Sequence, residues 1–461
     1  HACRVADALG ITRIVVHPLS GVLSAYGMGL ADRREVREAS LGVAVGDGAA
    51  IDVAADMLRN DAHAALVAQG VEASTVRIEV EAHIRAGASD SIIEVPLADE
   101  ASMRAGFAAG HRRRFGYATD AALVIDRLRV EAISETDTPT LPSPSARPAC
   151  ETVSVGLHVA GRTHAAPLHR RETLAVGAAI VGPALIVDAV ATLVVEPGWT
   201  ARVDGEGTLI LTRTDAAQHE AVGTAVDPVR LEIFAGLFMA IAEEMGAALQ
   251  HSAASVNIRE RLDFSCALFD AAGNLIANAP HIPVHLGSMG DSIRAIIGKR
   301  GGSIARGEVY ALNAPYDGGT HLPDITVVQP VFVGEERAPA YFVAARGHHA
   351  DVGGISPGSM PSNSRTIDDE GVIFDNILIV EQGELREAAI RDLLASGPHP
   401  ARNIDQNIAD LSAQVASCQR GATGLLNLVG DYGADVVTAY MHHVQDHAER
   451  AVRALIAGLE D

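Results

Sequence analysis

The sequence predicts a multidomain protein that combines α/β and α+β domains. Its 461 residues are enough for about two to four domains of ordinary size. Helix and strand patterns alternate over residues 1–133, short strand patterns fill residues 149–214, and strands combine with long helices over residues 227–461. An apolar content of 48% with 20% charged residues is typical of a folded globular chain.

The first part of the chain is predicted to be an α/β region. Apolar residues at helical spacing predict a helix over 50–69, and the alternating VRIEVEAHI of Val76–Ile84 predicts a half-exposed strand. A further helix is expected at Glu100–Phe115. Its basic cluster, Arg112–Arg114, is interpreted as a solvated helix end that suits the helix dipole, and not as a phosphate site. The strand predicted at Arg13–His17 is interpreted as the tail of an α/β unit.

A linker and a small β domain follow. The stretch Ser134–Pro148 (SETDTPTLPSPSARP) is rich in Pro, Ser and Thr, which favour turns and interrupt strand pairing. Short apolar runs separated by Gly and Pro then predict a small antiparallel β domain at residues 149–214. The polar stretch 215–226 predicts a second linker.

Long helices mark the last predicted domain, residues 227–461. Asp227-Pro228 supplies a helix N-cap followed by a proline in the first turn. The helix that follows runs to about His251 with a broad apolar face, so it is expected to be mostly buried. Two more long helices are predicted, at Ile404–Val429 and Ala434–Gly458.

A β-hairpin is predicted in the middle of this domain, with polar side chains at one end. Two apolar runs, Ile325–Val333 and Tyr341–Ala345, predict strands joined through Gly334–Pro339. Coordinating side chains stand just before the first strand and just after the second, so pairing would bring them together. These side chains are His321, Asp324, His348, His349 and Asp351.

Two or three imidazoles with a carboxylate form a ligand set that suits zinc, manganese or iron. We therefore predict a divalent metal site that includes His321, Asp324 and one or both of the adjacent His348 and His349. Asp351 is a candidate general base or a residue that orients an imidazole; it is also a candidate turn carboxylate. The alternative for the whole set is that strand-end His and Asp residues cap turns.

Two further histidines, His281 and His285, are candidate catalytic residues. Pro280 and Pro283 interrupt a helix through them, so an extended loop is expected there. From such a loop, one of the two imidazoles could reach the site.

Charge and composition exclude several classes of partner. A formal net charge of −22 repels phosphate backbones, so nucleic acid is not an expected partner. No apolar run approaches the ~20 residues that span a bilayer, and no membrane partner is expected. The four cysteines lie far apart without CxxC spacing, which predicts neither a disulfide framework nor a cysteine-rich zinc site and fits a cytoplasmic protein. The chain starts with His1 in a helical pattern and is interpreted as a fragment.

Long motifs occur in both parts of the chain. The later part contains RLDFSCALFD (Arg261–Asp270), NAPHIPVHLGSM (Asn278–Met289), GTHLPDITVVQPVF (Gly319–Phe332), RGHHADVGGISPGSMP (Arg346–Pro361) and RNIDQNIADLSAQVA (Arg402–Ala416). The earlier part contains HPLSGVLSAYGMGLAD (His17–Asp32), HRRRFGY (His111–Tyr117) and GPALIVDAVATLVVEPGW (Gly182–Trp199). These motifs resemble the hydantoinase B and hydantoinase A halves, respectively, of the ATP-dependent oxoprolinase/hydantoinase family, and the resemblance covers essentially the whole chain.

The resemblance implies a fold and cofactors for each half. The A half of the family resembles the actin and sugar-kinase ATPases, so residues 1–133 would be the end of such a unit. The loops that bind ATP and Mg²⁺ would lie upstream of His1, and no nucleotide-binding residue is expected here. In the related ketone carboxylases a His-x-x-Asp pair and a later histidine hold a metal, which corresponds to His321, Asp324 and either His348 or His349.

The resemblance also implies an activity. The A half would phosphorylate the amide oxygen of 5-oxo-L-proline, and the B half would hydrolyse the activated ring to L-glutamate. The substrate would then be 5-oxoproline or a related cyclic amide, and we expect a homo-oligomer. Alternatives within the family are ATP-dependent hydrolysis of N-substituted hydantoins and carboxylation of ketones; a further alternative is an inactive fragment.

Overall fold

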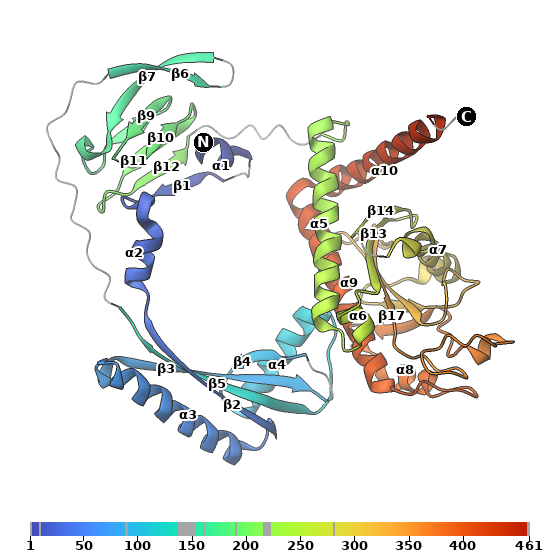
Figure 1. The fold of residues 1–461 in the computed structure, drawn as a ribbon. Helices are drawn as coiled ribbons and strands as arrows, with labels where there is room; N and C mark the ends of the chain where they lie inside the picture. The colour runs from blue at the N-terminus through green and yellow to red at the C-terminus, as the bar shows by residue number, and fades with distance from the viewer. Residues whose placement is uncertain are drawn as a thin grey trace. The chain divides into compact units, whose positions relative to one another are not determined.

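The computed structural model describes residues 2–8, 11–87, 91–136, 153–159, 162–189, 191–214, 223–279 and 282–458 (Figure 1). Two compact units are present, the first comprising His1–Glu35, His63–Ile78 and Ala132–Ala221 and the second Val36–Ala62, Glu79–Glu131 and Val222–Asp461. The predicted mixture of helices and several sheets is confirmed. Most of the two predicted linkers, 137–148 and 215–222, lies outside the described residues. None of the described helices has the length and apolar character needed to cross a membrane.

The first unit contains two four-stranded sheets, of order β1-β12-β11-β8 and β10-β9-β7-β6. The strands are β1 (Arg13–Val16), β6 (Val153–Val159), β7 (Arg162–Arg170), β8 (Ala179–Val181), β9 (Ala184–Val187), β10 (Thr192–Val195), β11 (Trp199–Val203) and β12 (Leu209–Arg213). They pack around a core that includes the fully buried Trp199 and, from helix α1 (Ala2–Ala8), Cys3. The short helix α2 (Leu23–Leu30) follows β1.

One expectation for this unit was wrong. The unit is not wholly antiparallel, because β7 and β9 pair in parallel. The strand at residues 13–16, interpreted from the sequence as the tail of an α/β unit, pairs antiparallel with β12. This second pairing joins segments that are far apart in the chain, which local patterns do not reveal.

A separate sheet of order β2-β5-β3-β4 carries two helices. Its elements are β2 (Arg33–Ala44), α3 (Gly48–Ala68), β3 (Val76–Ala86), β4 (Ile93–Pro96), α4 (Glu100–Phe115) and β5 (Leu123–Ser134). Helix α4 begins where the Asp99 carboxylate accepts a hydrogen bond from the Ser102 N–H, and it ends at Gly116 with a φ of 78°. The predicted helices at 50–69 and 100–115 are confirmed.

A seven-stranded sheet of order β14-β13-β17-β16-β15-β18-β19 forms the centre of the second unit. Its strands are β13 (Phe264–Asp270), β14 (Leu275–Asn278), β15 (Val309–Leu312), β16 (Asp324–Val331), β17 (Tyr341–His348), β18 (Ile377–Glu381) and β19 (Glu384–Leu385). Strands β13, β16 and β17 are buried on both faces, which explains their nearly continuous apolar sequences.

Helices cover both faces of this sheet (Figure 1). They are α5 (Pro228–Ser252), α6 (Val256–Arg259), α7 (Pro283–Arg300), α8 (Glu387–Leu394), α9 (Ile404–Tyr432) and α10 (Ala434–Ala457). Alternate strand residues face opposite helices: Val327 packs in the core with α5 and α9, whereas Val328 packs with α7.

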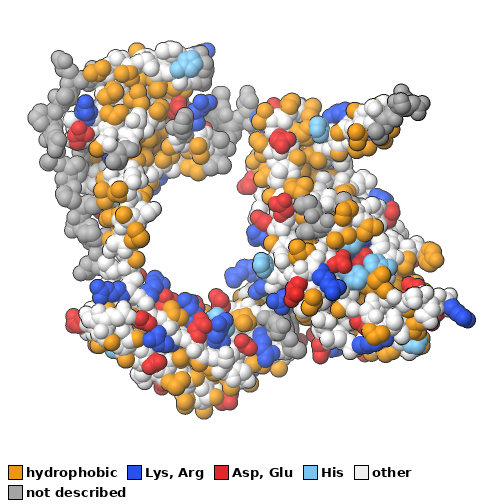
Figure 2. All heavy atoms as spheres, in the orientation of Figure 1, with side chains coloured by type: hydrophobic (Ala, Val, Ile, Leu, Met, Phe, Trp, Pro, Cys, Tyr) orange, Lys and Arg blue, Asp and Glu red, His pale blue; other side chains and the backbone are white. Residues whose placement is uncertain are grey.

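The three long helices predicted in this domain are confirmed as α5, α9 and α10. Helix α5 is only partly buried, however: Phe238 and Met245 lie in the core, while Val229 and Ile233 are among its exposed apolar side chains. Figure 2 shows hydrophobic side chains at the surface over this helix. The loop expected around His285 was also wrong, because α7 begins at Pro283 and includes His285. A proline in the first helical turn loses no hydrogen bond, so it starts this helix instead of interrupting it.

Candidate metal centre

The end of the β16–β17 hairpin is where the coordinating side chains meet. The two strands pair antiparallel, as predicted, and Asp324 lies directly opposite His348 in the register. His321 precedes β16 by one short turn, in which the Asp324 N–H donates to the His321 carbonyl. This local geometry brings His321, Asp324 and His348 to the same end of the hairpin.

Three ligand atoms converge there. Nδ1 of His321 lies 3.1 Å from Asp324 Oδ2, and Nδ1 of His348 lies 3.1 Å from Asp324 Oδ1. The three groups lie within 4.8 Å of one another. Two imidazoles and a carboxylate in this arrangement fit a borderline divalent ion such as zinc, manganese or iron, with His321, Asp324 and His348 as its protein ligands.

A second layer of side chains holds Asp324 in place. His285, on the first turn of α7, places Nε2 3.1 Å from Asp324 Oδ2, and its Nδ1 lies 2.9 Å from the Ser265 hydroxyl. The Thr320 hydroxyl also donates to Asp324 Oδ2, at 2.9 Å. Because His285 and Asp324 are only 2% and 1% exposed, His285 positions the carboxylate from behind and is not open to solvent.

The electrostatics of the cluster favour an ionised Asp324. Burial raises the pKa of Asp324, but hydrogen bonds from His285, His321 and His348 outweigh it and hold that pKa well below its usual range. The hydrogen bond with Asp324 in turn raises the pKa of His321. The His321 side chain is 39% exposed, so solvent reaches the cluster from the side of His321.

Arg346 is part of this region and was missed by the sequence analysis. It lies on β17 directly opposite Ser265 of β13 and Thr326 of β16, on the face that α7 covers. Its guanidinium is fully buried and donates to the hydroxyls of Thr326 (2.7 Å), Ser292 (2.8 Å) and Ser288. Arg346 makes no ion pair with a carboxylate among the described residues, and burial lowers its pKa to about 10. The sequence did contain a signal for Arg346. It precedes His348 by two positions on the same strand, so the two side chains point to the same face of the sheet.

His349 is not part of the cluster. It is fully buried, with Nε2 3.0 Å from Gln414 Oε1 and Nδ1 accepting from the Asn407 side-chain amide at 3.1 Å. Its neighbour His348 faces Asp324 instead, because successive side chains point to opposite faces at the end of a strand. The structure thus separates the two members of the predicted pair, and the inclusion of His349 as a metal ligand is corrected.

Asp351 and His281 are the remaining two residues that were predicted for the site. The Asp351 carboxylate accepts from the backbone N–H groups of Gly353 and Gly358 and from the Arg402 guanidinium at 2.6 Å. These contacts make Asp351 a loop anchor, as in the alternative turn interpretation, and give it no contact with the cluster. His281 lies outside the described residues.

The chain is similar in sequence to known proteins. The chain matches the hydantoinase B/oxoprolinase family over residues 227–461, the hydantoinase/oxoprolinase family over residues 1–37, and the hydantoinase/oxoprolinase C-terminal domain over residues 117–213. It is 37% identical to 5-oxoprolinase 1 of Arabidopsis thaliana, over 99% of this chain and 37% of that protein. It is 36% identical to the 5-oxoprolinase of Dictyostelium discoideum, over 99% of this chain and 36% of that protein.

A shorter relative matches part of the chain. The caprolactamase subunit beta of Pseudomonas jessenii is 32% identical over 51% of this chain and 40% of its own length. The chain therefore spans well under half the length of these curated relatives. The match over residues 227–461 covers half of the chain and includes the whole cluster around Asp324. The predicted resemblance is thus confirmed, and the chain belongs to the hydantoinase B/oxoprolinase family.

Proposed function

We propose that this protein takes part in the ATP-dependent opening of a small cyclic amide, with 5-oxo-L-proline as the substrate, and that the ring is hydrolysed at the cluster around Asp324. The observation that carries the proposal is the convergence of His321, Asp324 and His348 at one hairpin end. The relatives named 5-oxoprolinase support the choice of substrate.

The chemistry explains why ATP is needed. Amide resonance stabilises the five-membered lactam, so its opening requires coupling to a favourable reaction. Transfer of the ATP γ-phosphoryl group to the amide oxygen yields ADP and an activated ring. Two water molecules are then consumed: the ring C–N bond breaks, the amine takes up protons, and a carboxylate and inorganic phosphate are released. ATP and Mg²⁺ would act at the A-type part of the protein, and the hydrolytic steps at the B-type part.

The residues of the second unit have distinct roles in this proposal. His321, Asp324 and His348 would hold a divalent ion, which when bound supplies Lewis-acid activation of water or of the attacked carbon. His285 and Thr320 fix the Asp324 carboxylate, so its oxygens do not reorient during turnover.

The arrangement of these side chains also indicates how the substrate would enter and which charge it would carry. The ring would approach from the exposed side of His321, because Asp324 and His285 are closed to solvent. The buried Arg346 adds a fixed positive charge behind the cluster, which favours a substrate that carries a phosphoryl group.

The proposal is tested by His321→Ala, with the exposed His442→Ala as the matched control. Metal analysis of the purified proteins should show a bound divalent ion in the wild type and the control, and its loss in His321→Ala. In the full-length protein, phosphate release and amino-acid formation are measured on the same sample with 5-oxoproline, hydantoin or caprolactam. His321→Ala should keep ATP-dependent phosphate release while glutamate formation falls by at least about tenfold, since it removes an interaction of the hydrolytic steps only.

Two results would contradict the proposal. Equal metal content in wild type and His321→Ala would remove the metal site. A parallel loss of phosphate and glutamate in a folded variant would show that the cluster also serves phosphorylation, and the division between the two parts would be wrong.

A further inference from the structure

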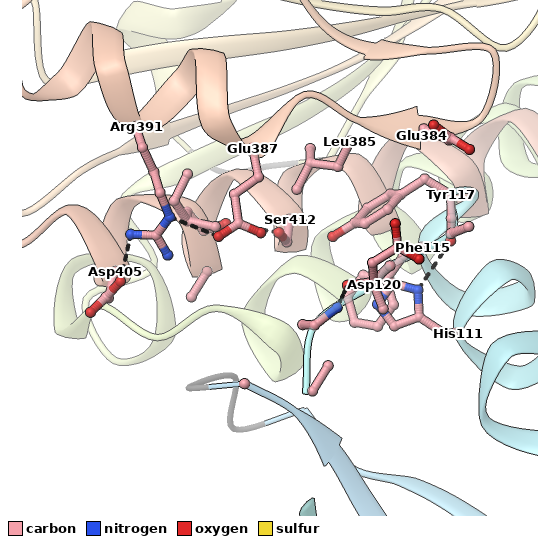
Figure 3. Close-up of a pocket in the computed structure, with 17 residues that line it drawn as sticks. His111, Phe115, Tyr117, Asp120, Glu384, Leu385, Glu387, Arg391, Asp405 and Ser412 are labelled. Carbon is pink, nitrogen blue, oxygen red and sulfur yellow. Dashed lines mark hydrogen bonds and ion pairs between the residues drawn. The ribbon is translucent and has the colours of Figure 1, made fainter. Parts of the chain in front are cut away.

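A second site candidate lies in the second unit, away from the cluster around Asp324. It is a cavity of about 390 Å³ between the end of α4, the segment that follows it, and helices α8 and α9 (Figure 3). Its wall includes the family motif HRRRFGY of residues 111–117, which the proposed reaction does not use. Residues far apart in sequence, such as Tyr117 and Ser412, face each other across it (Figure 3).

His111 lines this cavity, and its ring nitrogen Nε2 has no hydrogen-bond partner among the described residues. Its side chain is 94% buried, and its Nδ1 lies 3.0 Å from the Tyr117 carbonyl oxygen. A carbonyl only accepts, so Nδ1 carries the proton, while burial lowers the pKa of His111 and keeps the ring neutral. The ring is fixed by stacking on Phe115, with 4.5 Å between centroids. Nε2 therefore offers a lone pair, and no described residue donates to it.

The hydroxyl groups on the wall are also acceptors. Ser412 donates its proton to the Ile408 carbonyl at 2.8 Å, so its oxygen can only accept from a further group. Tyr117 keeps a free lone pair on its oxygen. The Arg391 guanidinium, which could have donated into the cavity, is directed at Glu387 and Asp405, at 2.7 Å each.

The cavity is strongly acidic. Four carboxylates and one guanidinium line it, and the side chains of Asp120 and Glu384 make no hydrogen bond or ion pair with another described residue. Among the described residues, the compact group of three or more potential metal ligands is the cluster around Asp324. The carboxylates of this cavity do not form such a group, so the lining is not a second metal centre. The lining therefore suits a cation that is larger than a metal ion and rich in N–H donors.

We propose that this cavity binds the primary ammonium group of a small organic molecule. Three N–H donors match the acceptors offered by His111, Tyr117 and the free carboxylates, and the positive charge matches the acidic lining. Opening of a cyclic amide creates such an ammonium group, so the amino-acid product is one source of the ligand and an unrelated amine is the other. The choice of L-glutamate as a probe rests on the proposed function; the ammonium site itself does not.

Titration calorimetry on the whole chain tests the proposal with three probes. Butane-1,4-diamine and L-glutamate carry primary ammonium groups, whereas tetramethylammonium carries the charge without any N–H. We expect a saturable heat with at least one of the first two probes and binding at least about tenfold weaker with tetramethylammonium. The double variant Asp120→Asn/Glu384→Gln removes two charges at near-constant volume and should weaken amine binding at least about tenfold. Asp392→Asn, an exposed position on α8 outside the cavity, should bind as the wild type does.

Each possible result either supports or overturns the proposal. No saturable heat with either amine, unchanged binding in the double variant, or equal binding of tetramethylammonium would each overturn the proposal. Binding of L-glutamate supports a product site, and binding of the diamine alone supports the same site with a ligand from outside the reaction. A negative calorimetry result would not bear on the metal analysis of His321→Ala, so the ammonium site and the proposed function are tested independently.

Discussion

At the scale of single residues, Asp324 and Arg346 define the electrostatics of the candidate centre. Asp324 receives hydrogen bonds on both oxygens, whereas Arg346 is a buried cation balanced by hydroxyl groups and not by a carboxylate. Burying an unpaired charge is costly, so its retention points to a use beyond stability. In the proposed reaction that use is to attract an anionic substrate next to a bound cation.

Arg346→Met should therefore strengthen metal binding while weakening catalysis. Removing a like charge close to the ion should raise its affinity roughly tenfold, or about 1.4 kcal/mol. Arg346→Lys keeps the charge and should retain near wild-type metal affinity. Affinity is measured by competition with a chromophoric chelator, and turnover by glutamate release. Weaker metal binding in both variants would assign Arg346 a structural role only.

His111 gives a prediction for the pH dependence of stability. Burial lowers the pKa of His111 in the folded state, whereas the unfolded chain takes up this proton near its ordinary value of about 6.5. The unfolded state therefore binds more protons below that pH. The contribution of His111 is fully present above about pH 6.5 and is lost as the pH falls through the window beneath it.

The test compares melting temperatures at about pH 7.5 and about pH 5. His111→Gln keeps a donor for the Tyr117 carbonyl but does not titrate, so its melting temperature should fall less on acidification than that of the wild type. His442→Gln, at an exposed position, should behave as the wild type. An equal fall in all three proteins would mean that protonation of His111 does not limit stability.

At the scale of elements, α9 is joined to the sheet by polar as well as apolar contacts. The Gln414 side chain is fully buried and donates to the backbone carbonyls of Ile325 on β16 and Ala345 on β17, at 2.8 Å each. Its oxygen accepts from His349. One side chain thus spans the two strands whose ends carry the candidate metal ligands.

Gln414→Leu should destabilise the second unit by about 1–3 kcal/mol, because the buried His349 N–H loses its acceptor and two carbonyls lose a donor. Asn427→Leu, an exposed position on the same helix, should change stability by less than about 0.5 kcal/mol. Urea denaturation followed by circular dichroism measures both. A wild-type midpoint for Gln414→Leu would show that apolar packing alone holds α9 on the sheet.

At the scale of the whole molecule, the chain consists of two units with separate cores, and both site candidates lie in the second. The two candidates differ in chemistry. The cluster around Asp324 is a compact group of side chains that could hold a metal ion, whereas the cavity beside His111 has a volume of about 390 Å³ and offers mainly acceptors. A reaction site and an ammonium site can therefore be tested with different probes on the same protein.

The sequence by itself determined the elements whose signals are local. Strand-like apolar runs and polar strand ends predicted the β16–β17 hairpin and the meeting of His321, Asp324 and His348, because antiparallel neighbours joined by a short loop must bring their outer ends together. Apolar periodicity and capping predicted α5, and the long family motifs predicted the family.

Only the tertiary structure decided which side chains complete the sites. His348 and His349 are equivalent in the sequence, and they were separated by the pleat of β17 and by the polar side chains of α9. Packing of α7 on the sheet brought His285 behind Asp324 and enclosed Arg346. The cavity beside His111 depends on contact between segments that are far apart in the chain. Such contacts arise from the packing of whole elements, which backbone preference and local periodicity do not encode.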